Sequence, residues 1–468
     1  MVFLDRSEEL GRLRGTTGRG EGCLVVVWGR RRVGKTRLLL EWAGPAGGLY
    51  WVADESNPSL QRRYLAEALG ARLPGFGEVE YRDFGALLSR LGREARLARW
   101  RGPLILDELP YLVAAAPELP AALQRFVDHE LPGSGLVLAL CGSSQRMMQG
   151  LTLDGGAPLY GRARELLKVR PLPIGHLGAA LRLRDPTAIV RSFAAWGGIP
   201  RYWELAQPFA DVGEAVEALV LDPLGPLHEE PVRLLLDERP PALTLRPLLD
   251  AIGGGAHRLS EIGARIGQPA TSLARPLQRL QELDLVVREA PFGEPERSGK
   301  RSLYKLADPL LRLWFSVVAP KRSLLVQAPR RIRRQLFDQA APRLCALTWE
   351  ELCRAAVPRL GESLGGLDFG PARRFWLGSG PEWDVVAQAP GGELLLGEVK
   401  WSATPPTVAE VEGALHSLLG KGLPPGLGSG ERPTHRAIFV PRLPRGLRRR
   451  QAERIHFIDA GDLLAVLR

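Results

Sequence analysis

The sequence predicts an α/β protein of several domains, with a parallel β-sheet in the first of them. Three observations lead to this prediction. The chain has 468 residues, which is too long for one ordinary core. Within residues 1–170, short and uniformly apolar runs alternate with segments of helical periodicity, the order that parallel sheets require. A second mixture of strands and helices begins near residue 341.

The first 170 residues contain four expected strands, each short and apolar. They are Cys23–Trp28, Leu49–Val52, Pro103–Leu106 and Gly135–Leu140. Helices are expected at Thr36–Trp42, 59–72, 83–99 and Leu119–Glu130. Because the strands are apolar throughout, we expect helices to cover both faces of the sheet.

Four further regions follow this core. Residues 171–240 are helical with several prolines and are expected to form a small lid. Residues 241–306 show three short helices, a strand at Leu285–Arg288, a charged turn and a strand at Leu303–Leu306, which is the order of a winged helix. Residues 307–340 are expected to be a connector, and residues 341–468 a last α/β domain.

A glycine-rich turn follows the first expected strand and precedes a helix. It reads Gly29-Arg30-Arg31-Arg32-Val33-Gly34-Lys35-Thr36, which fits the pattern GxxxxGK[ST]. Glycines let such a loop curl so that backbone N–H groups and the helix N-terminus face phosphate oxygens. Lys35 is expected to reach the β- and γ-phosphates of ATP as a catalytic residue, and Thr36 to offer its hydroxyl to Mg²⁺. We predict that Gly29–Thr36 and the adjoining Arg37 bind ATP; the alternative is a tight turn with an accidental Lys and Thr.

Two acids end the third expected strand and supply the second half of the site. Asp107 is expected to hold Mg²⁺ through water, and Glu108 to polarise the attacking water as a catalytic base. A solvated strand end is the alternative. The fourth strand ends in Gly142-Ser143-Ser144, where Ser143 or Ser144 can sense the γ-phosphate or simply cap a helix.

These motifs together resemble the archaeal-type ATPases of the AAA+/STAND group, which carry a C-terminal domain of unknown function numbered 234. The resemblance covers essentially the whole chain. It is carried by Phe3–Leu10, Trp28–Thr36, Leu106–Glu108, Gly142–Ser144, Pro158–Arg162 and Gly197–Tyr202. It implies that Arg162 approaches the γ-phosphate as a finger or sensor, in the same chain or in a neighbouring copy. It also implies that Gly198–Pro200 packs near the adenine and ribose, so that Pro200 binds the cofactor.

Within the expected winged helix, His257–Gln268 and Thr271–Leu283 form a helix–turn–helix pair, with Ser272 expected as an N-cap. Leu273, Leu277, Leu280 and Leu283 give the second helix an apolar stripe. Arg275 and Arg279 share another face and are expected to contact phosphates or base edges of DNA. Pro276 is tolerable there only in the first turn. The alternative is a winged helix that packs or gates the ATPase without touching DNA.

The last domain contains two expected strands, Trp383–Ala387 and Leu394–Trp401, joined through Gly391-Gly392 as a hairpin. Glu398 and Lys400 lie two residues apart and so point to one face, where Asp384 of the adjacent strand can join them. The arrangement resembles the core of PD-(D/E)xK nucleases, a restriction-endonuclease-like α/β fold. Asp384, Glu398 and one acid of the preceding helix, with Glu351 preferred to Glu350, would then bind Mg²⁺, and Lys400 would orient the water.

Three interpretations of this last group are open: an active nuclease, a nuclease fold that kept its acids but only binds, and a surface ion pair between Glu398 and Lys400. The formal net charge of +11 favours a polyanionic partner such as DNA, although a merely basic surface is equally compatible. Two basic tracts, Arg330–Arg334 and Arg442–Arg450, can track a nucleic-acid backbone or be solvated charge runs.

The four cysteines form no metal-binding spacing, and Cys23 and Cys141 are expected to be buried thiols. The N-terminal residues do not resemble a signal peptide, and no apolar run is long enough to cross a membrane, so we expect a cytoplasmic protein. The sequence therefore predicts an ATPase that uses ATP and Mg²⁺ and acts on DNA, coupled to a metal-dependent nuclease site. An ATP-switched DNA-binding regulator and a protein-remodelling or signalling ATPase remain alternatives, and homo-oligomers are open.

Overall fold

The computed structural model describes residues 3–17, 20–236, 238, 242–295, 301–427, 433–447 and 454–468. The chain folds into two compact units, which we describe separately. The N-terminal unit comprises Phe3–Pro171 together with the later segment Val232–Leu243, and the C-terminal unit comprises Leu172–Pro231 and Thr244–Arg468. The finer division into five domains stays a prediction.

The N-terminal unit is built on a five-stranded parallel sheet in the order β2-β3-β4-β1-β5. Its strands are β1 (Cys23–Trp28), β2 (Leu49–Val52), β3 (Leu104–Asp107), β4 (Val137–Gly142) and β5 (Ala163–Lys168). The predicted parallel α/β core is therefore confirmed. The fifth strand was not predicted, because β5 lies at the sheet edge and reads Ala-Arg-Glu-Leu-Leu-Lys, which lacks the uniform apolar character of the other strands.

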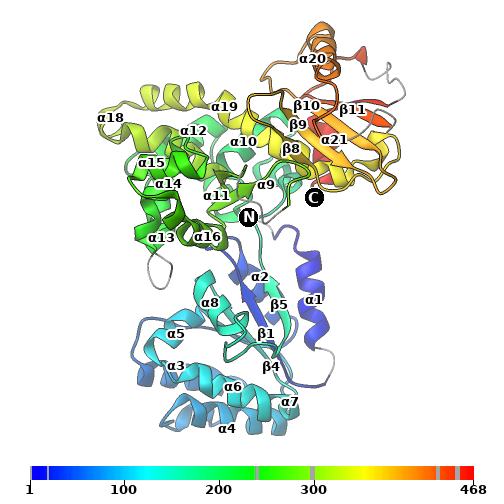
Figure 1. Cartoon of the computed structure of the whole chain (residues 1–468). Helices are drawn as coiled ribbons and strands as arrows, with labels where there is room; N and C mark the ends of the chain where they lie inside the picture. The colour runs from blue at the N-terminus through cyan, green and yellow to red at the C-terminus, as the bar shows by residue number, and fades with distance from the viewer. Residues whose placement is uncertain are drawn as a thin grey trace. The chain divides into compact units, whose positions relative to one another are not determined.

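Helices alternate with these strands. They are α1 (Ser7–Thr17), α2 (Lys35–Ala43), α3 (Pro58–Gly70), α4 (Phe84–Leu97), α5 (Leu109–Ala115), α6 (Leu119–His129), α7 (Leu131–Ser134) and α8 (Gln145–Thr152). Figure 1 shows α3, α4 and α6 gathered together, while α1 lies beside β5. One hydrophobic core joins the sheet to the first group: Leu24 and Leu138 of the strands pack with Phe84 and Phe126 of the helices. This burial holds the carboxyl ends of the strands, where the predicted phosphate loop begins, in a fixed frame.

The C-terminal unit is largely helical. Its helices are α9 (Leu177–Leu181), α10 (Pro186–Trp196), α11 (Pro200–Ala206), α12 (Val212–Val216), α14 (Arg246–Gly253), α15 (Leu259–Ile266), α16 (Ala274–Glu282), α17 (Pro309–Leu313), α18 (Arg322–Gln327), α19 (Arg330–Ala356), α20 (Val408–Gly420) and α21 (Ala460–Val466). Helix α13 (Glu230–Leu236) spans the point at Pro231 where the chain passes between the units.

Helices α14, α15 and α16 precede an antiparallel pair, β6 (Val286–Glu289) and β7 (Leu303–Leu306), in the order expected of a winged helix. The four leucines of the predicted stripe on the last helix are all buried. Ser272 is not an N-cap, because it lies inside the 3-10 turn Ala270–Leu273 that precedes α16 and donates to the carbonyl of Pro269. Pro276 does lie in the first turn of α16. Residues 296–300 of the predicted wing lie outside the described residues.

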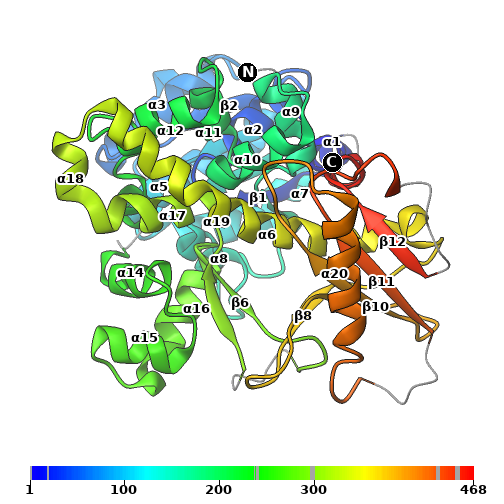
Figure 2. The ribbon, with the colours of Figure 1, turned by 90° about the horizontal axis from the view of Figure 1, so that it is seen from above.

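The second sheet has the order β12-β11-β10-β9-β8. Its strands are β8 (Arg373–Phe375), β9 (Trp383–Gln388), β10 (Leu394–Val399), β11 (Thr434–Phe439) and β12 (Ile455–Ile458). The first three strands pair antiparallel and the last three pair parallel, so the sheet is mixed. The expected hairpin at Gly391-Gly392 joins β9 to β10. Figure 2 shows α20 lying across β10 and β11, and Val411 and Leu418 of this helix pack on Leu396 and Ile438 of those strands.

The basic run Arg330–Arg334 does not lie in an irregular connector, because it begins the long helix α19. Arg330 pairs with Glu217 at 3.0 Å, Arg333 with Asp222 at 2.9 Å, and Arg334 with Asp211 at 2.8 Å. Most of this tract is therefore neutralised by acids of the same unit, which argues against its use as a nucleic-acid track. In the second tract, Arg442 pairs with Asp185, and residues 448–450 lie outside the described residues.

All four cysteines are free and buried, as expected for Cys23 and Cys141. Among the described residues, no helix is both long enough and apolar enough to cross a membrane.

Candidate functional site

The loop between β1 and α2 has the curled backbone that a phosphate cradle needs. Gly29 has a φ of 153°, and a Cβ placed there would lie 2.4 Å from the carbonyl oxygen of Val169, so no side chain fits. Gly34 has a φ of 95° and forms the N-cap of α2. Arg32, between them, also has a left-handed φ of 70°. These conformations turn the loop back on itself at the helix N-terminus.

Lys35 is buried inside this loop. Its ammonium donates to the carbonyl oxygens of Gly29 at 2.9 Å and Arg30 at 3.3 Å, and to the hydroxyl of Ser143 at 3.1 Å. A buried ammonium surrounded by oxygen acceptors is poised to bind phosphate oxygens in their place. The contact of Lys35 with the β- and γ-phosphates stays a prediction.

Asp107 is buried at the end of β3 and receives two side-chain hydroxyls. Thr36 donates to Asp107 Oδ2 at 3.2 Å, and Tyr50 of β2 donates to the same oxygen at 2.5 Å. Burial, together with the hydrogen bond to Asp107, raises the pKa of the Tyr50 phenol, so Tyr50 stays a donor. Sequence reasoning predicted Thr36 and Asp107 but missed Tyr50. The feature that could have pointed to Tyr50 is the parallel pairing of β2 with β3, which brings side chains of the two strands close together at the same end of the sheet.

Glu108 follows directly and has a left-handed φ of 52° at the N-cap of α5. Its backbone N–H donates to Asp107 Oδ1 at 2.8 Å, and its carboxylate accepts from the hydroxyl of Ser143 at 2.8 Å. Ser143 therefore contacts both the lysine that is predicted to bind phosphate and the predicted base. Of the two serines that the sequence offered as sensors, Ser143 is the one in this position.

Ser144 makes a different contact. Its hydroxyl donates to Glu238 Oε2 at 3.1 Å, and the next backbone N–H, of Gln145, lies 3.4 Å from Glu238 Oε1. Glu238 belongs to Val232–Leu243, the segment that returns to the N-terminal unit. Ser143 thus contacts Lys35 and Glu108, and the adjacent Ser144 contacts the returning segment.

The remaining loop residues lie where the motif requires them, with different exposures. Arg30 and Val33 are buried, and Arg31 is partly exposed. Arg37 is exposed and pairs with Glu41 one turn along α2 at 2.7 Å, so its role in binding ATP stays a prediction.

Arg6 also supports the loop and was missed as a site residue. Its side chain is buried, and Nη2 donates to the carbonyl oxygens of Val33 at 3.1 Å and Arg170 at 2.6 Å. In the sequence, Arg6 was marked only as part of the Phe3–Leu10 motif, which carries the family resemblance. The motif did not indicate what Arg6 does physically. The guanidinium ties the phosphate loop to Arg170, two residues after the end of β5.

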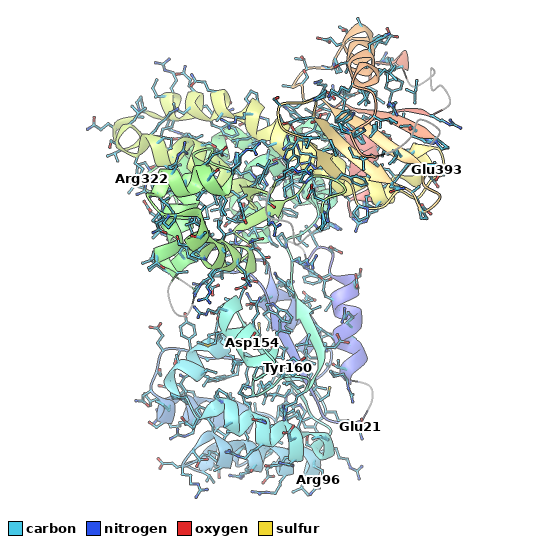
Figure 3. The ribbon with its side chains drawn as sticks, in the orientation of Figure 1. Glu21, Arg96, Asp154, Tyr160, Arg322 and Glu393 are labelled. Carbon is cyan, nitrogen blue, oxygen red and sulfur yellow. The ribbon has the colours of Figure 1, made fainter. Side chains whose placement is uncertain are left out.

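Arg162 does not approach the phosphate loop within its own chain. It precedes β5, whose residue Ala163 pairs with Leu24, near the start of β1, whereas the loop follows Trp28 at the opposite end. Arg162 instead forms two hydrogen bonds, of 2.7 and 3.0 Å, to Asp128 of α6. Tyr160, two residues before Arg162 and labelled in Figure 3, has a side chain that is about half exposed. Arg162 does not approach the loop of its own chain in this structure because the parallel register puts it at the opposite end of the strands; a role toward another copy stays a prediction.

Pro200 begins α11 in the C-terminal unit, and the neighbouring Gly198 carbonyl accepts from the Leu172 N–H at 2.7 Å. Its predicted contact with adenine and ribose stays a prediction.

The C-terminal unit brings Asp384, Glu398 and Lys400 together at one end of adjacent strands. Asp384 Oδ2 accepts from the backbone N–H of Val399 at 2.9 Å, and Lys400 pairs with Glu398 at 2.8 Å. Burial raises the pKa of the Asp384 carboxyl to about 6, and the charges of Glu350 and Glu398 add to this rise. Burial opposes the charge of Lys400, but its bond to Glu398 and the nearby acids outweigh this and raise the pKa of its ammonium.

The acid of the preceding helix that joins this group is Glu350, not the preferred Glu351. Glu350 raises the pKa of Asp384 through its charge and pairs with Arg354 at 3.5 Å. Glu351 instead pairs with Arg312 of α17 at 2.7 Å. One residue along a helix rotates the side chain by about 100°, so the sequence could not fix which of the two adjacent acids faces the strands.

Lys421, directly after α20, is a further member that sequence reasoning missed. It pairs with the second oxygen of Glu398 and donates to the backbone carbonyl of Glu382 at 2.8 Å. Both oxygens of Glu398 therefore contact lysine ammonium groups. Within the described parts of the chain, no group of three or more His, Cys, Asp or Glu side chains is placed to hold a metal ion.

Arg275 and Arg279 both lie on α16, with Arg275 exposed and Arg279 partly buried. Their contact with nucleic acid stays a prediction.

Comparison with known proteins gives two family matches. Residues 3–178 match a family described as ATPase domains predominantly from Archaea. Residues 314–412 match a family of archaeal and bacterial proteins of unknown function, the domain numbered 234. Both matches agree with the resemblance that the sequence motifs indicate.

Two single proteins are also similar. A protein of Methanocaldococcus jannaschii described as uncharacterized is 29% identical over 328 residues, which is 69% of this chain and 70% of that protein. A Walker-type ATPase of Pyrococcus abyssi has a similar structure, with a TM-score of 0.52 and 21% identity over 67% of this chain and 96% of that one. At this identity the second likeness concerns the fold.

Proposed function

Since this chain joins an ATPase domain of the predominantly archaeal family to a C-terminal domain of the second family, we propose that it is an ATPase that acts on DNA and cuts it at a Mg²⁺-dependent C-terminal site. The ATPase part follows from the family. The DNA substrate and the cleavage are the proposal, and they rest on the residues gathered around Asp384.

The residues of the phosphate loop fit ATP and Mg²⁺. Lys35 would bind phosphate oxygens in place of its present oxygen acceptors, the carbonyls of Gly29 and Arg30 and the Ser143 hydroxyl. Thr36 and Asp107, 3.2 Å apart, would hold Mg²⁺, directly and through water. The ion, when bound, neutralises charge on the phosphates. Glu108 would take the proton of the attacking water, and Ser143 restrains the carboxylate that does so.

The observation that carries the proposed nuclease is the convergence of Asp384, Glu398 and Lys400 on adjacent strands, with Glu350 beside them. A buried carboxyl whose pKa rises to about 6, surrounded by two further acids, is costly to keep unless the group has a task. Asp384 and Glu398 are the carboxylates that would hold Mg²⁺, after a rearrangement of side chains that are not placed for a metal ion here, and the ion would polarise the scissile phosphate. Lys400 would orient the water and balance the charge that develops on the phosphate oxygens.

The contacts of the two serines support a link between ATP and the rest of the chain. Ser143 contacts Lys35 and Glu108, while Ser144 holds Glu238 of the returning segment. A change at the γ-phosphate would alter the first set of bonds and bias the second. The coupling predicts that Asp107→Ala changes ATP-dependent DNA binding or cleavage; identical behaviour of this variant and the wild type would exclude it.

One observation favours a second candidate, an ATP-switched DNA-binding regulator with an inactive nuclease fold. Lys400 and Lys421 contact the two oxygens of Glu398. Two ammonium groups on one carboxylate compete with a divalent cation for the same oxygens. A metal must displace at least one of them for the site to work.

The experiment incubates the purified protein with single- and double-stranded DNA and Mg²⁺ or Mn²⁺, with and without ATP. Lys35→Ala and Asp384→Ala are compared with the wild type, and Asp368→Asn, at an exposed acid of the same unit, is the control. Cleavage that is lost in Asp384→Ala but kept in Asp368→Asn supports the nuclease, and its response to Lys35→Ala reports the dependence on ATP. DNA binding without cleavage supports the regulator. No affinity for DNA at physiological salt would instead favour a protein-remodelling or signalling ATPase.

A further inference from the structure

A strongly basic cavity lies on the C-terminal unit between the β6–β7 hairpin and helix α19. Its volume is about 510 Å³. Its charged lining consists of Arg288, Glu289, Lys305, Arg312, Glu351, Arg354 and Arg373. Five cations against two carboxylates give the lining a formal charge of +3. Like charges gathered in a concave, partly dehydrated site repel one another, and an anion that binds there relieves the repulsion.

The walls of this cavity are held in place by bonds between the hairpin and the last domain. Glu289 pairs with Lys305 of the hairpin, with Arg354 at 3.8 Å and with Arg374 at 3.6 Å. The Phe292 N–H donates to the Arg374 carbonyl at 2.7 Å and fastens the end of the hairpin to β8. The cations are therefore presented on a fixed frame and do not need to be ordered when a ligand binds.

Arg312 gives the cavity a buried positive charge. Its side chain is 9% exposed, pairs with Glu351, and donates to the Leu306 carbonyl at 2.9 Å. Its Nη1 has no hydrogen-bond partner among the described residues. The carboxylate of Glu351 thus uses only part of the hydrogen-bonding capacity of the Arg312 guanidinium. Further negative charge near Arg312 would therefore be favourable.

The cavity also connects two elements of the proposed function. Gln281 of α16, the helix that carries Arg275 and Arg279, lines one side. Arg354 is another lining residue, and its Nη1 donates to the backbone carbonyl of Asp384 at 3.1 Å. Glu350 and Glu351 are consecutive on α19, one directed toward Asp384 and the other toward Arg312. The cavity lining therefore includes one residue of α16 and one residue bonded to Asp384.

We propose that this cavity is a phosphate-binding site for a nucleic-acid strand, which it guides toward Asp384 and Glu398. The inference rests on the proposed DNA substrate and adds where the strand is held. None of the described residues that line the cavity has an aromatic ring, so base stacking does not contribute to binding there. The contacts are to the phosphodiester backbone, independent of sequence, and bind through release of counterions.

The test measures binding of a fluorescein-labelled DNA strand to the full-length protein in EDTA, so that cleavage plays no part. The variant is Arg288→Ala with Arg373→Ala, and the control is Arg359→Ala, an exposed arginine of the same unit. We expect the Kd to rise at least about tenfold and the slope of log Kd against log salt to fall by about two, roughly one per lost phosphate contact. The control should keep the wild-type slope. An unchanged Kd and slope in the double variant would overturn the proposal.

Two further measurements keep the outcome clear. Arg373→Ala alone, at the edge strand, is the second variant if the double variant does not fold, and its slope should fall by about one. A labelled mononucleotide is titrated against Lys35→Ala, whose phosphate loop is disabled; binding that depends on Arg288 and Arg373 would assign the cavity to a small phosphorylated ligand and overturn the strand. Absence of cleavage by the wild type, with a Kd that still depends on Arg288 and Arg373, would overturn only the nuclease, so the two proposals fail separately.

Discussion

The hydroxyl of Ser143 donates to the carboxylate of Glu108 at 2.8 Å. The hydroxyl oxygen of Ser143 also accepts a hydrogen bond from the ammonium of Lys35. One serine therefore contacts both the predicted base and the lysine of the phosphate loop. This bond links the two halves of the nucleotide site, and the first prediction concerns it.

Glu108→Gln should reduce kcat for ATP hydrolysis by about 10²–10⁴-fold, because an amide cannot take the proton of water. Binding of ATP should persist, since Lys35, Thr36 and Asp107 are intact. Steady-state hydrolysis and binding of a fluorescent ATP analogue measure the two effects. Glu118→Gln, at an exposed acid of the same unit, is the control. Hydrolysis at the wild-type rate would remove Glu108 as the base.

Tyr50→Phe should raise the Mg²⁺ concentration needed for half-maximal ATPase activity by about 10–150-fold. The phenol donates to Asp107 Oδ2, and hydrogen bonds to a charged group are worth roughly 1.5–3 kcal/mol. A titration of activity against Mg²⁺ at saturating ATP checks this. Tyr64→Phe, at an exposed tyrosine, should leave the titration unchanged. Equal Mg²⁺ dependence in both variants would mean that Tyr50 does not position Asp107.

Arg6→Ala should destabilise the N-terminal unit by roughly 1–3 kcal/mol and raise KM for ATP, because two backbone carbonyls lose a buried cationic donor. Thermal unfolding measures the loss of stability, and the rate of hydrolysis as a function of ATP concentration measures KM. Arg12→Ala removes only an exposed pair with Glu165 and should change the melting temperature little. Similar melting curves for both variants would contradict the role given to Arg6.

Asp384→Asn should abolish cleavage and stabilise the protein above pH 6. The folded-state pKa of Asp384, about 6, lies above the value of an unfolded carboxyl, so the folded state binds this proton more tightly. Stability of the wild type should therefore fall as pH rises from about 4 to 6, by roughly 1–3 kcal/mol, and then level off. The variant should lack this fall. Melting temperatures at pH 4, 6 and 8, with Asp368→Asn as control, decide the matter; parallel profiles for wild type and Asp384→Asn would refute it.

Glu350→Gln should lower DNA cleavage by at least about tenfold, while Glu351→Gln should leave the chemical step unchanged, because only Glu350 acts on Asp384. Single-turnover cleavage at saturating DNA separates the step from binding, which Glu351 can alter through Arg312. The opposite order of effects would restore Glu351 as the nuclease acid.

Much of this molecule was predictable from the sequence, for identifiable reasons. The apolar runs that became β1, β3 and β4 carry their burial in composition, and the phosphate loop carries its function in spacing. β5 was missed because an edge strand exposes polar side chains on one face. Tyr50 and Lys421 were missed because each reaches the site from an element distant in sequence, and only strand register or helix packing brings them near. Arg162 was misplaced because a motif shows that a residue is present but does not show at which end of the strands it lies.

The return of Val232–Leu243 to the N-terminal unit limits how the gene can be divided. A fragment that stops at Pro171 keeps every residue of the phosphate loop but omits Glu238, the acid bonded to Ser144 at the end of β4. The nucleotide-binding half is thus discontinuous along the chain, and it cannot be excised or exchanged between relatives as one uninterrupted cassette. A chimera meant to keep this fold must carry both Phe3–Pro171 and Val232–Leu243.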